Sequence, residues 1–337
     1  MARWIRRIAR WLVVAIGFAL ALAGVAMMVL YLRPDLQAGS STVVKLSSFI
    51  PYGVLAWVVV ALILVFSRRH WVKALAVPAI GLAVLQFVWS AGPYWPRPAA
   101  AASESLVVMT LNTYFGMADP AQLAVEAERA QPDVVVLTEV DVDLWRSLQA
   151  SAWTDVLPYH VGEPGEDWTS DATMVFARHP VTLIETLGTS PQQHVVTLDH
   201  PSGPVTVVAV HARNPSDGYE PWASSLLDIQ RAAAAHADRP LVALGDFNAV
   251  REHVALQQLL DSGLTDAAQQ AGAGWLPTFP TRLYAWWPSV PSTVVTPPLI
   301  GVDHVLVNDR LSAVSVESFD MVGTDHRGLV ARLGFVG

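Results

Sequence analysis

The chain contains no cysteine among its 337 residues. Disulfides therefore do not stabilise it, which is compatible with an exported protein but does not by itself indicate one. Lysine is almost as rare: only Lys45 and Lys73 occur, and every basic residue beyond position 100 is an arginine. The chain also shows no internal repeat, and hydrophobic runs and strand patterns indicate its domain organisation.

Acidic residues are nearly absent from the first hundred positions, and basic residues are scarce in the rest. Residues 1–100 hold ten lysines and arginines and a single acidic residue, Asp35. Subtracting these from the chain totals of 21 and 29 leaves 11 basic and 28 acidic residues for positions 101–337. Because proteins bind nucleic acids mainly through basic contacts to phosphates, this acidic portion is not expected to bind nucleic acid.

Three long apolar runs stand out in a chain that is 53% hydrophobic with a mean hydropathy of +0.38. They cover about residues 11–32, 49–66 and 71–89, and each is near the length that crosses a bilayer. Buried core helices are the alternative, but three such runs with basic flanks at one end of the chain favour membrane spans. Residues 1–92 are thus predicted to form a membrane domain with three transmembrane helices.

The positions of basic residues predict the orientation of this membrane domain. Four arginines precede the first run, and three basic residues lie around the turn between the second and third runs. Because cytoplasmic loops are enriched in Lys and Arg, we expect a multi-pass plasma-membrane protein with a cytoplasmic N-terminus and an extracytoplasmic C-terminal domain. The first run could instead be a cleaved signal peptide, since Ala21-Leu22-Ala23 resembles a cleavage site, and the sidedness of the C-terminal domain would not change.

Beyond a linker rich in proline and alanine at residues 93–104, the pattern changes to short apolar strands. Strands are expected at 106–111, 133–137, 173–177, 195–198, 205–210, 241–244, 302–307, 314–319 and 329–333, and helices at 120–131 and 222–237. Many strands with few helices predict two packed sheets flanked by helices. Residues 105–337 are therefore expected to form one extracytoplasmic α/β domain.

Polar side chains stand at the ends of several of these strands. Gly245-Asp246-Phe247-Asn248-Ala249 closes the strand at 241–244, and strand alternation places Asp246 and Asn248 on the same side. An unpaired charge is costly to bury, so such residues are expected to line a site. Equivalent strand-end positions hold Asn112, Glu139, His211, Asp303, Asp325 and His326. If these ends converge, their oxygen ligands suit a hard cation such as Mg²⁺.

Six motifs, in this order, resemble the endonuclease/exonuclease/phosphatase superfamily, which includes DNase I-like nucleases, inositol-polyphosphate 5-phosphatases and neutral sphingomyelinases. They are Leu111-Asn112, Thr138-Glu139, His211, Gly245-Asp246-Phe247-Asn248-Ala249, Val302-Asp303-His304-Val305 and Thr324-Asp325-His326. The resemblance covers about residues 106–333 and implies a four-layered α/β sandwich. Thr324 replaces the serine that is common in the family but keeps a hydroxyl.

The resemblance also implies a divalent cofactor, Mg²⁺ or alternatively Mn²⁺, and assigns four residues around it. Glu139 would be the main metal ligand, with Asn112 beside it. Asp246 would orient and deprotonate the attacking water. Asn248 would bind a phosphoryl oxygen or help to fix Asp246.

The resemblance assigns two histidines to the phosphate and two aspartates to a histidine or a metal. His211 and His326 would bind the scissile phosphate and stabilise its developing charge. Asp303 would hold His326 in the required tautomer or help to bind a metal, and Asp325 would take whichever of these two roles Asp303 does not. His304 alternates with Asp303 along the strand and is expected to face the other way and to pack.

Four further residues are candidates for substrate contact. Arg213 and Asn214 closely follow His211, although a surface turn explains them equally well. Trp286 and Trp287 lie in a stretch, residues 275–300, that is rich in aromatic residues and proline and almost uncharged. This stretch is either a loop packed over the sandwich or an apolar lip that touches a membrane or a lipid tail.

Together these observations predict a membrane-anchored, Mg-dependent phosphoesterase acting on a lipid phosphate or pyrophosphate outside the cytoplasm, with the substrate and the bilayer as partners. The three-span layout also resembles the VanJ-type membrane proteins of this superfamily. That resemblance implies undecaprenyl pyrophosphate as substrate and a role in lipid-carrier recycling or teicoplanin resistance. The alternatives are a phospholipid phosphodiesterase resembling sphingomyelinase, an exported nuclease, and a non-catalytic binding module, against which the presence of all the motif residues argues.

Overall fold

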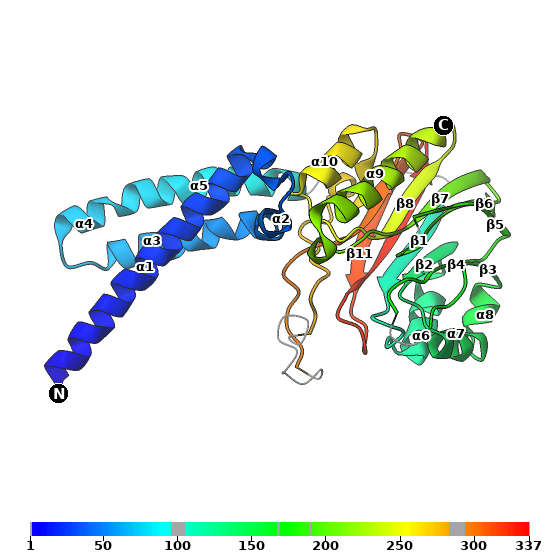
Figure 1. Ribbon diagram of the computed structural model, residues 1–337, viewed down its shortest axis with the longest axis horizontal. Coiled ribbons are helices and arrows are strands. Elements are labelled where there is room, and N and C mark those ends of the chain that lie inside the picture. The colour runs from blue at the N-terminus through cyan, green and yellow to red at the C-terminus, as the bar shows by residue number, and fades with distance from the viewer. Residues whose placement is uncertain (1, 96–104, 167–168, 189, 283–293, 337) are drawn as a thin grey trace. The chain divides into compact units, whose positions relative to one another are not determined.

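The computed structural model describes residues 2–95, 105–166, 169–188, 190–282 and 294–336 (Figure 1). The chain forms two compact units. Unit 1 comprises Met1–Pro93 with Glu252–Val254, and unit 2 comprises Tyr94–Arg251 with Ala255–Gly337. The apolar runs lie in unit 1 and the strand-end motifs lie in unit 2.

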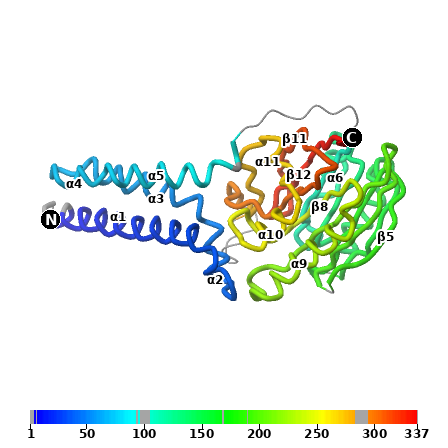
Figure 2. Tube along the Cα trace, turned by 90° about the horizontal axis from the view of Figure 1, so that it is seen from above, coloured from blue at the N-terminus to red at the C-terminus, as the bar shows by residue number. Residues whose placement is uncertain are grey.

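Unit 1 is a set of helices that follow the apolar runs. Its elements are α1 (Ala2–Leu32), η1 (Pro34–Gln37), α2 (Ser41–Ser47), η2 (Ile50–Tyr52), α3 (Gly53–Val65), α4 (His70–Ala74) and α5 (Ala76–Ala91), where η marks a 3₁₀ helix. Helices α1, α3 and α5 run side by side (Figures 1 and 2). Trp57 and Val60 of α3 pack with Ala79 and Ala83 of α5 in a small apolar core, while the outward faces of the helices remain apolar and exposed.

The second predicted span is shorter and more bent than the sequence suggested. Two helical stretches, Arg7–Leu32 and His70–Ala91, are long and apolar enough to cross a membrane. Helix α3 has 13 residues, or about 20 Å at 1.5 Å per residue, which is less than the roughly 30 Å of a hydrocarbon core. It qualifies only within the pair Ser41–Ser47 and Ile50–Val65, which is bent by 49°. The described residues thus contain two candidate spans, or three if the bent pair is one span.

Unit 2 contains two six-stranded mixed sheets. The strands are β1 (Ser105–Asn112), β2 (Val134–Thr138), β3 (Tyr159–Val161), β4 (Thr173–Ala177), β5 (Val181–Leu187), β6 (Gln193–His200), β7 (Gly203–His211), β8 (Leu241–Asp246), β9 (Thr265–Asp266), β10 (Asp303–Val307), β11 (Leu311–Phe319) and β12 (Gly328–Phe335). Their order is β11-β12-β1-β2-β4-β3 in the first sheet and β5-β6-β7-β8-β10-β9 in the second. Each sheet has one parallel pair at its centre, β1 with β2 and β7 with β8.

The sheets pack face to face around a core of fully buried valine and leucine side chains. Val108 and Val136 from the first sheet meet Val207 and Leu244 from the second in this core. The helices of unit 2 are α6 (Pro120–Ala130), α7 (Val142–Gln149), α8 (Trp153–Val156), η4 (Pro215–Asp217), α9 (Tyr219–Ala235), α10 (Val254–Asp261) and α11 (Ala267–Gln270). Helices α6 and α7 pack on the other face of the first sheet, and α9 packs against β7 and β8. The predicted α/β class with two packed sheets is confirmed.

Most of the predicted elements are present with shifts at their ends. Helix α6 begins as expected, because the Asp119 side chain accepts hydrogen bonds from the backbone of Ala121 and Gln122 with proline at the first helical position. The second predicted helix, 222–237, starts earlier, at Tyr219. Strand β5 was not predicted, because it is an edge strand with most residues exposed and lacks the apolar alternation of a half-buried strand.

The parallel pairs place the polar strand ends next to one another. Asn112 lies opposite Thr138 at the carboxyl ends of β1 and β2, and His211 lies opposite Asp246 at the carboxyl ends of β7 and β8. Strand β10 runs antiparallel to β8, so its first residue, Asp303, also pairs with Asp246. The topology therefore gathers the motif residues at one end of the sandwich.

Candidate active site

Asp246 lies buried at the end of β8, where the backbone is tightly packed against β7. A Cβ atom on Gly245 would lie 1.9 Å from the carbonyl oxygen of Val210, and φ is 143°, so only glycine fits before Asp246. Asp246 Oδ1 accepts a hydrogen bond from the Asn248 backbone (2.8 Å) and Oδ2 accepts one from Asn112 Nδ2 (3.0 Å). Burial, reinforced by the charge of Asp303, raises the pKa of Asp246.

Asn112 joins the two sheets at the site. Its Nδ2 donates to Glu139 Oε1 as well as to Asp246 Oδ2, both at 3.0 Å. Glu139 follows β2 in a left-handed conformation with φ of 59°, and its second oxygen, Oε2, accepts a hydrogen bond from the Phe115 backbone at 3.0 Å. The predicted metal ligand Glu139 and the predicted base Asp246 are thus held by one shared amide.

Backbone strain is concentrated around these residues. Tyr114, Phe115, Glu139 and Asn248 are four of the five described non-glycine residues with positive φ. Each such residue costs about 1–2 kcal/mol, and strain of this kind tends to be stored at functional sites. The turn at Tyr114 and Phe115 also directs two N–H groups at the site, to Asn112 Oδ1 (2.9 Å) and to Glu139 Oε2.

His326 forms a buried pair with Asp303. His326 Nδ1 and Asp303 Oδ2 are 2.8 Å apart, and His326 Nε2 lies 3.9 Å from both Asp246 Oδ2 and Asp325 Oδ1. Burial opposes the charged imidazole, but the neighbouring charge of Asp303, with those of Asp246 and Asp325, raises the pKa of His326 to about 10. Burial raises the pKa of Asp325 to about 6.

The hydroxyl of Thr324 has a defined position beside this pair. It donates to the Asn112 carbonyl oxygen at 2.7 Å and accepts a hydrogen bond from the His326 backbone at 3.0 Å. The hydroxyl that Thr324 keeps in place of the family's serine thus connects the segment bearing His326 to β1.

His211 and Asn248 complete the cluster. His211 Nε2 lies 3.7 Å from Glu139 Oε1. Asn248 Nδ2 donates to the Ala212 carbonyl oxygen (2.9 Å) and lies 3.4 Å from Asp246 Oδ2. All eight predicted motif residues therefore belong to one set of neighbouring side chains.

The predicted substrate contacts divide into three cases. Asn214 joins the cluster, because its Nδ2 donates to Asn248 Oδ1 at 3.1 Å. The described hydrogen bond of Arg213 is formed by its backbone with Ser225, so the contacts do not bring its guanidinium to the cluster. Trp286 and Trp287 lie outside the described residues.

The residues present suit a divalent cation. Asp246, Asp303 and His326 are buried, with one nitrogen or carboxylate oxygen of each within 4.8 Å of the others, and the two carboxylates are the cation ligands while His326 is protonated. Among the described groups, Asp303 Oδ1 and Asp325 Oδ1 are buried without a hydrogen-bond partner, as is His211 Nδ1. Buried acceptors that lack partners are costly, and a hard cation or its waters would satisfy them. This group differs from the predicted pair of Glu139 and Asn112 but is joined to it through Asp246.

Three contributors to the cluster were missed from the sequence. The Tyr114 and Phe115 turn has no local signal apart from Gly116 after it. Trp222 on α9 donates to the Asn248 carbonyl oxygen at 3.0 Å, a contact between distant segments. The Phe279 ring lies 4.9 Å from that of His326, and its place in the aromatic stretch before Asp303 could have indicated it.

Comparison with known proteins gives a family match over the same residues. Residues 109–326, more than half of the chain, match the family model described as the endonuclease/exonuclease/phosphatase family. No curated protein matches the chain.

Solved structures share the fold at low sequence identity. An endonuclease/exonuclease/phosphatase from Beutenbergia cavernae is 21% identical, with a TM-score of 0.51, and covers 69% of this chain and 72% of its own. A family protein from Leptotrichia buccalis is 16% identical, with a TM-score of 0.51, over 68% of this chain and 100% of its own. D. rerio TDP2, complexed with a single-strand DNA product, is 15% identical, with a TM-score of 0.51, over 69% and 100%.

Proposed function

Because the chain belongs to the endonuclease/exonuclease/phosphatase family, we propose that it is a membrane-anchored, metal-dependent phosphoesterase that hydrolyses a lipid-linked phosphate or pyrophosphate. Members of this family are mostly metal-dependent hydrolases. The observation that carries the proposal is the convergence of the buried acids, amides and histidines at one end of the sandwich, with carboxylate oxygens of Asp303 and Asp325 left without described partners.

The acids of the cluster would hold Mg²⁺, or Mn²⁺ in its place. Glu139, which Asn112 joins to Asp246, offers oxygen ligands on one side, and Asp303 offers its unpartnered Oδ1 on the other. When bound, the ion would polarise the phosphoryl oxygens and neutralise the charge that develops on them.

Asp246 would orient the attacking water and take its proton. The Asn248 backbone and the Asn112 amide fix both oxygens of this carboxylate, so its direction is set before substrate arrives. Its raised pKa makes the ionised form a stronger base than a solvent-exposed aspartate.

His326 would stabilise the negative charge of the phosphoryl group. Its raised pKa keeps the ring protonated at neutral pH, and Asp303 holds the Nδ1 proton. Nε2 is then free to donate toward the phosphate. His211 would also donate to the phosphate, and Asn248, which Asn214 holds in place, would help to fix Asp246.

Two observations favour a lipid as the substrate. Unit 1 supplies two or three candidate membrane spans, so covalent attachment would keep the catalytic unit near a bilayer. Residues 101–337 hold 28 acidic and 11 basic residues, which opposes binding of a nucleic acid.

The distribution of basic residues supports an extracytoplasmic catalytic domain after a linker at 93–104. The specific substrate that we propose is undecaprenyl pyrophosphate, with a role in carrier recycling or teicoplanin resistance, as the likeness to VanJ-type proteins implies.

A panel of substrates tests this proposal. The full chain, purified in detergent, is given undecaprenyl pyrophosphate, a phospholipid or DNA with Mg²⁺, and phosphate release or product formation is measured. We expect hydrolysis of the lipid pyrophosphate and, in Asp246→Ala, a loss of about 10²–10⁴-fold, as is typical when a general base is removed.

Asp238→Ala is the matched control, because it removes the same kind of group from a side chain that is 74% exposed. It should retain wild-type activity. Cleavage of DNA alone would contradict the lipid assignment, cleavage of the phospholipid alone would favour a phosphodiesterase, and no activity on any of the three would favour a binding module.

A further inference from the structure

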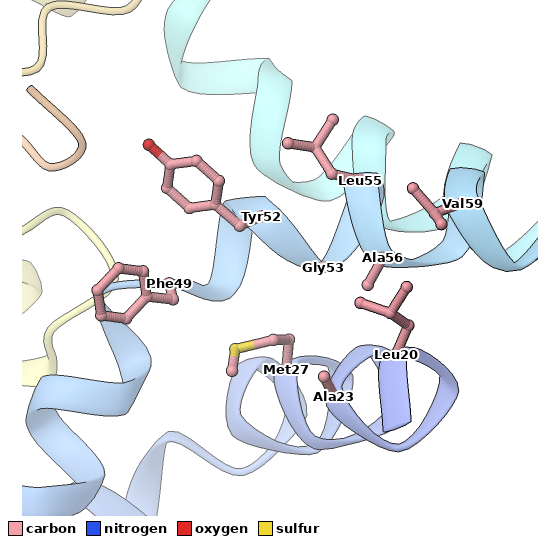
Figure 3. Close-up of a pocket in the computed structure, with 9 residues that line it drawn as sticks. All are labelled: Leu20, Ala23, Met27, Phe49, Tyr52, Gly53, Leu55, Ala56 and Val59. Atoms are coloured by element: carbon pink, nitrogen blue, oxygen red, sulfur yellow. The ribbon is translucent and has the colours of Figure 1, made fainter. Parts of the chain in front are cut away.

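The two units differ in whether polar atoms face the space between their packed elements. In unit 1, the groove between α1 and the start of α3 is lined by apolar side chains such as Leu20 and Val59, and the hydroxyl of Tyr52 points away from them (Figure 3). Between the two sheets of unit 2, several buried polar atoms have no hydrogen-bond partner among the described residues. Such atoms are costly to bury unless a ligand or an ordered water satisfies them, so this space is where a bound polar partner is expected.

Three of these polar side chains face into the space between the sheets at its catalytic end. The core residues that β2, β4 and β7 direct toward the opposite sheet occupy alternate positions of each strand. Thr138, Thr173 and His211 each stand two residues from the nearest of these core residues on their own strand. All three therefore face the opposite sheet as well.

The strand register puts the three side chains at one level of the sandwich. Thr138 of β2 lies opposite Asn112 of β1 on one side and opposite Thr173 of β4 on the other. On the second sheet, His211 lies opposite Asp246. Asn112 hydrogen-bonds to Asp246 between the sheets, and β2 and β4 pack against β7. The two threonines therefore lie across from His211.

Each of the three side chains has a buried polar atom that needs a partner. Thr138 and Thr173 are fully buried, and His211 is 3% exposed. Thr138 Oγ1, Thr173 Oγ1 and His211 Nδ1 form no hydrogen bond with described residues. The other ring nitrogen of His211, Nε2, lies 3.7 Å from Glu139 Oε1. Nδ1 is therefore the ring nitrogen that remains for an orienting contact.

The lengths of the side chains leave room for a small molecule between them. Stacked sheets pack about 10 Å apart. Asn112 and Asp246 span this separation directly, with 3.0 Å between Nδ2 and Oδ2. The side chain of threonine ends one bond sooner than that of asparagine, so Thr138 and Thr173 stop short of the opposite sheet. Polar atoms on several sides of a small buried space are what an ordered water requires.

We propose that Thr138 and Thr173 hold a buried water that orients His211, an inference that rests on the proposed function of His211 as a donor to the phosphate. The water accepts a hydrogen bond from each threonine hydroxyl and donates one to His211 Nδ1. Because Nδ1 then accepts, the ring proton stays on Nε2, the atom that donates to the phosphate. Thr138 and Thr173 are thus positioning residues that act through His211.

The sign of a stability change tests the water site without an assay of activity. Thr138→Val and Thr173→Val keep the shape of each side chain and remove its hydroxyl. Each variant should unfold at a lower temperature than the wild type, because the water and His211 lose a partner. Thermal unfolding of unit 2 in the full chain, followed in EDTA, measures this. Unfolding temperatures equal to or above that of the wild type would overturn the water site.

Thr110→Val is the matched control for these variants. Thr110 is also fully buried on the inward face of β1, and its hydroxyl also has no partner among the described residues. Its neighbours on the adjoining strands are the apolar residues Val136 and Leu329. Removal of an unpaired hydroxyl from apolar surroundings relieves a desolvation cost, so Thr110→Val should unfold at the same or a higher temperature than the wild type.

The ring of His211 reports its own orientation. Nitrogen NMR of the full chain with isotope-labelled histidine distinguishes the two ring tautomers, and His211→Gln identifies the signals of this residue by their loss. The wild type should show the tautomer with the proton on Nε2, and the double variant of Thr138→Val with Thr173→Val should show a mixture. The same tautomer in both proteins would overturn the positioning role.

Kinetics separate this proposal from the proposed function. Each valine variant should lower kcat for the lipid pyrophosphate about tenfold with little change in KM, because a misoriented His211 loses its contact with the developing charge. Thr138→Ser and Thr173→Ser keep the hydroxyl and should stay close to the wild type. Equal kcat in the valine variants and the wild type would reject the positioning role alone. A tautomer change without hydrolysis of any substrate by the wild type would retain the water site and reject the proposed activity.

Discussion

Strand β10 separates two buried pairs of histidine and aspartate that differ in what surrounds them. On one side Asp303 pairs with His326 at 2.8 Å, and on the other the next residue, His304, lies 3.4 Å from Asp266. In both pairs the carboxylate raises the pKa of the histidine against the opposing effect of burial. The two pairs therefore offer the same chemistry in two environments.

The pair of His304 and Asp266 uses its described polar atoms within the fold. His304 Nε2 lies 2.8 Å from the Ala249 carbonyl oxygen, and its ring packs edge-on to Phe247. Asp266 Oδ1 accepts hydrogen bonds from the backbone of Ala268 and Gln269 at the start of α11. This pair ties β10, the loop after β8 and α11 together.

The pair of His326 and Asp303 has polar atoms that are not hydrogen-bonded within the described residues. Asp303 Oδ1 has no described hydrogen-bond partner, and His326 Nε2 is 3.9 Å from its nearest described acids, Asp246 and Asp325. Unsatisfied buried groups are costly unless a ligand or substrate uses them. The pair of Asp303 and His326 is available for chemistry because it has a carboxylate oxygen without a described partner, whereas Asp266 and His304 hydrogen-bond within the fold.

The two pairs should differ most in how much their histidines contribute to activity. His326→Gln should lower kcat/KM for the lipid pyrophosphate by about 10²–10⁴-fold, because it removes the residue proposed to stabilise the phosphoryl charge. His304→Gln, measured per folded molecule, should stay within a few-fold of the wild type. Equal losses of kcat/KM in the two variants would show that the two pairs do not differ in function.

The reverse order is expected for stability. Asp266→Asn removes the carboxylate that keeps the buried His304 protonated, and breaking a buried pair in this way costs about 3–5 kcal/mol. Asp303→Asn should cost less, because Asp303 lies among other acids that repel it and that the substitution relieves. Thermal unfolding of unit 2 in the full chain, followed in EDTA, measures both variants, and a more stable Asp266→Asn than Asp303→Asn would be inconsistent with the assignment.

The pH dependence of stability tests whether His326 is protonated in the folded protein. Its folded pKa, about 10, lies above the ordinary value of 6.5, so its contribution is complete below about pH 6.5 and is lost as the pH rises toward 10. The difference in unfolding free energy between the wild type and His326→Gln, measured in EDTA, should therefore shrink from pH 6.5 to pH 10. A constant difference over this range would show that the ring is neutral in the folded protein.

A smaller effect is expected from the backbone strain at Tyr114, beside the cluster of motif residues. Tyr114 has a φ of 51°, where glycine is favoured over other residues. Tyr114→Ala removes the ring and keeps the strain, whereas Tyr114→Gly removes both, so the glycine variant should be more stable by about 1 kcal/mol. Chemical denaturation of the two variants measures this difference in unfolding free energy. Equal values for the two variants would show that the backbone at Tyr114 is not strained.

The sequence predicted what depends on local pattern. The strands β1, β2, β7, β8 and β10 are apolar runs, and the residues that close or open them converge because the topology aligns those ends. The left-handed backbone of Glu139 and the hydrogen bond from the Trp222 ring to Asn248 depend on tertiary contacts and leave no local signal. His304 was expected to pack; its partner Asp266 lies on a strand of two residues, too short for a periodic pattern to reveal.

Unit 1 was less predictable. The run at 49–66 is continuous in hydropathy, but the η2 segment and the buried amide of Gln86 bend the chain before α3. Hydropathy records composition and does not record such a bend, so it predicted one continuous span where the structure has a short helix that qualifies only within a bent pair.

The central claim is that the converged strand ends form a metal-dependent phosphoesterase centre. Its most direct test is phosphate release from undecaprenyl pyrophosphate by the full chain in EDTA, after return of Mg²⁺ or Mn²⁺, and in Asp246→Ala with the metal present. We expect phosphate release to be lost in EDTA and restored by either ion. In Asp246→Ala it should be reduced by at least about 10²-fold. Release that persists in EDTA at the same rate in the wild type and in Asp246→Ala would contradict it.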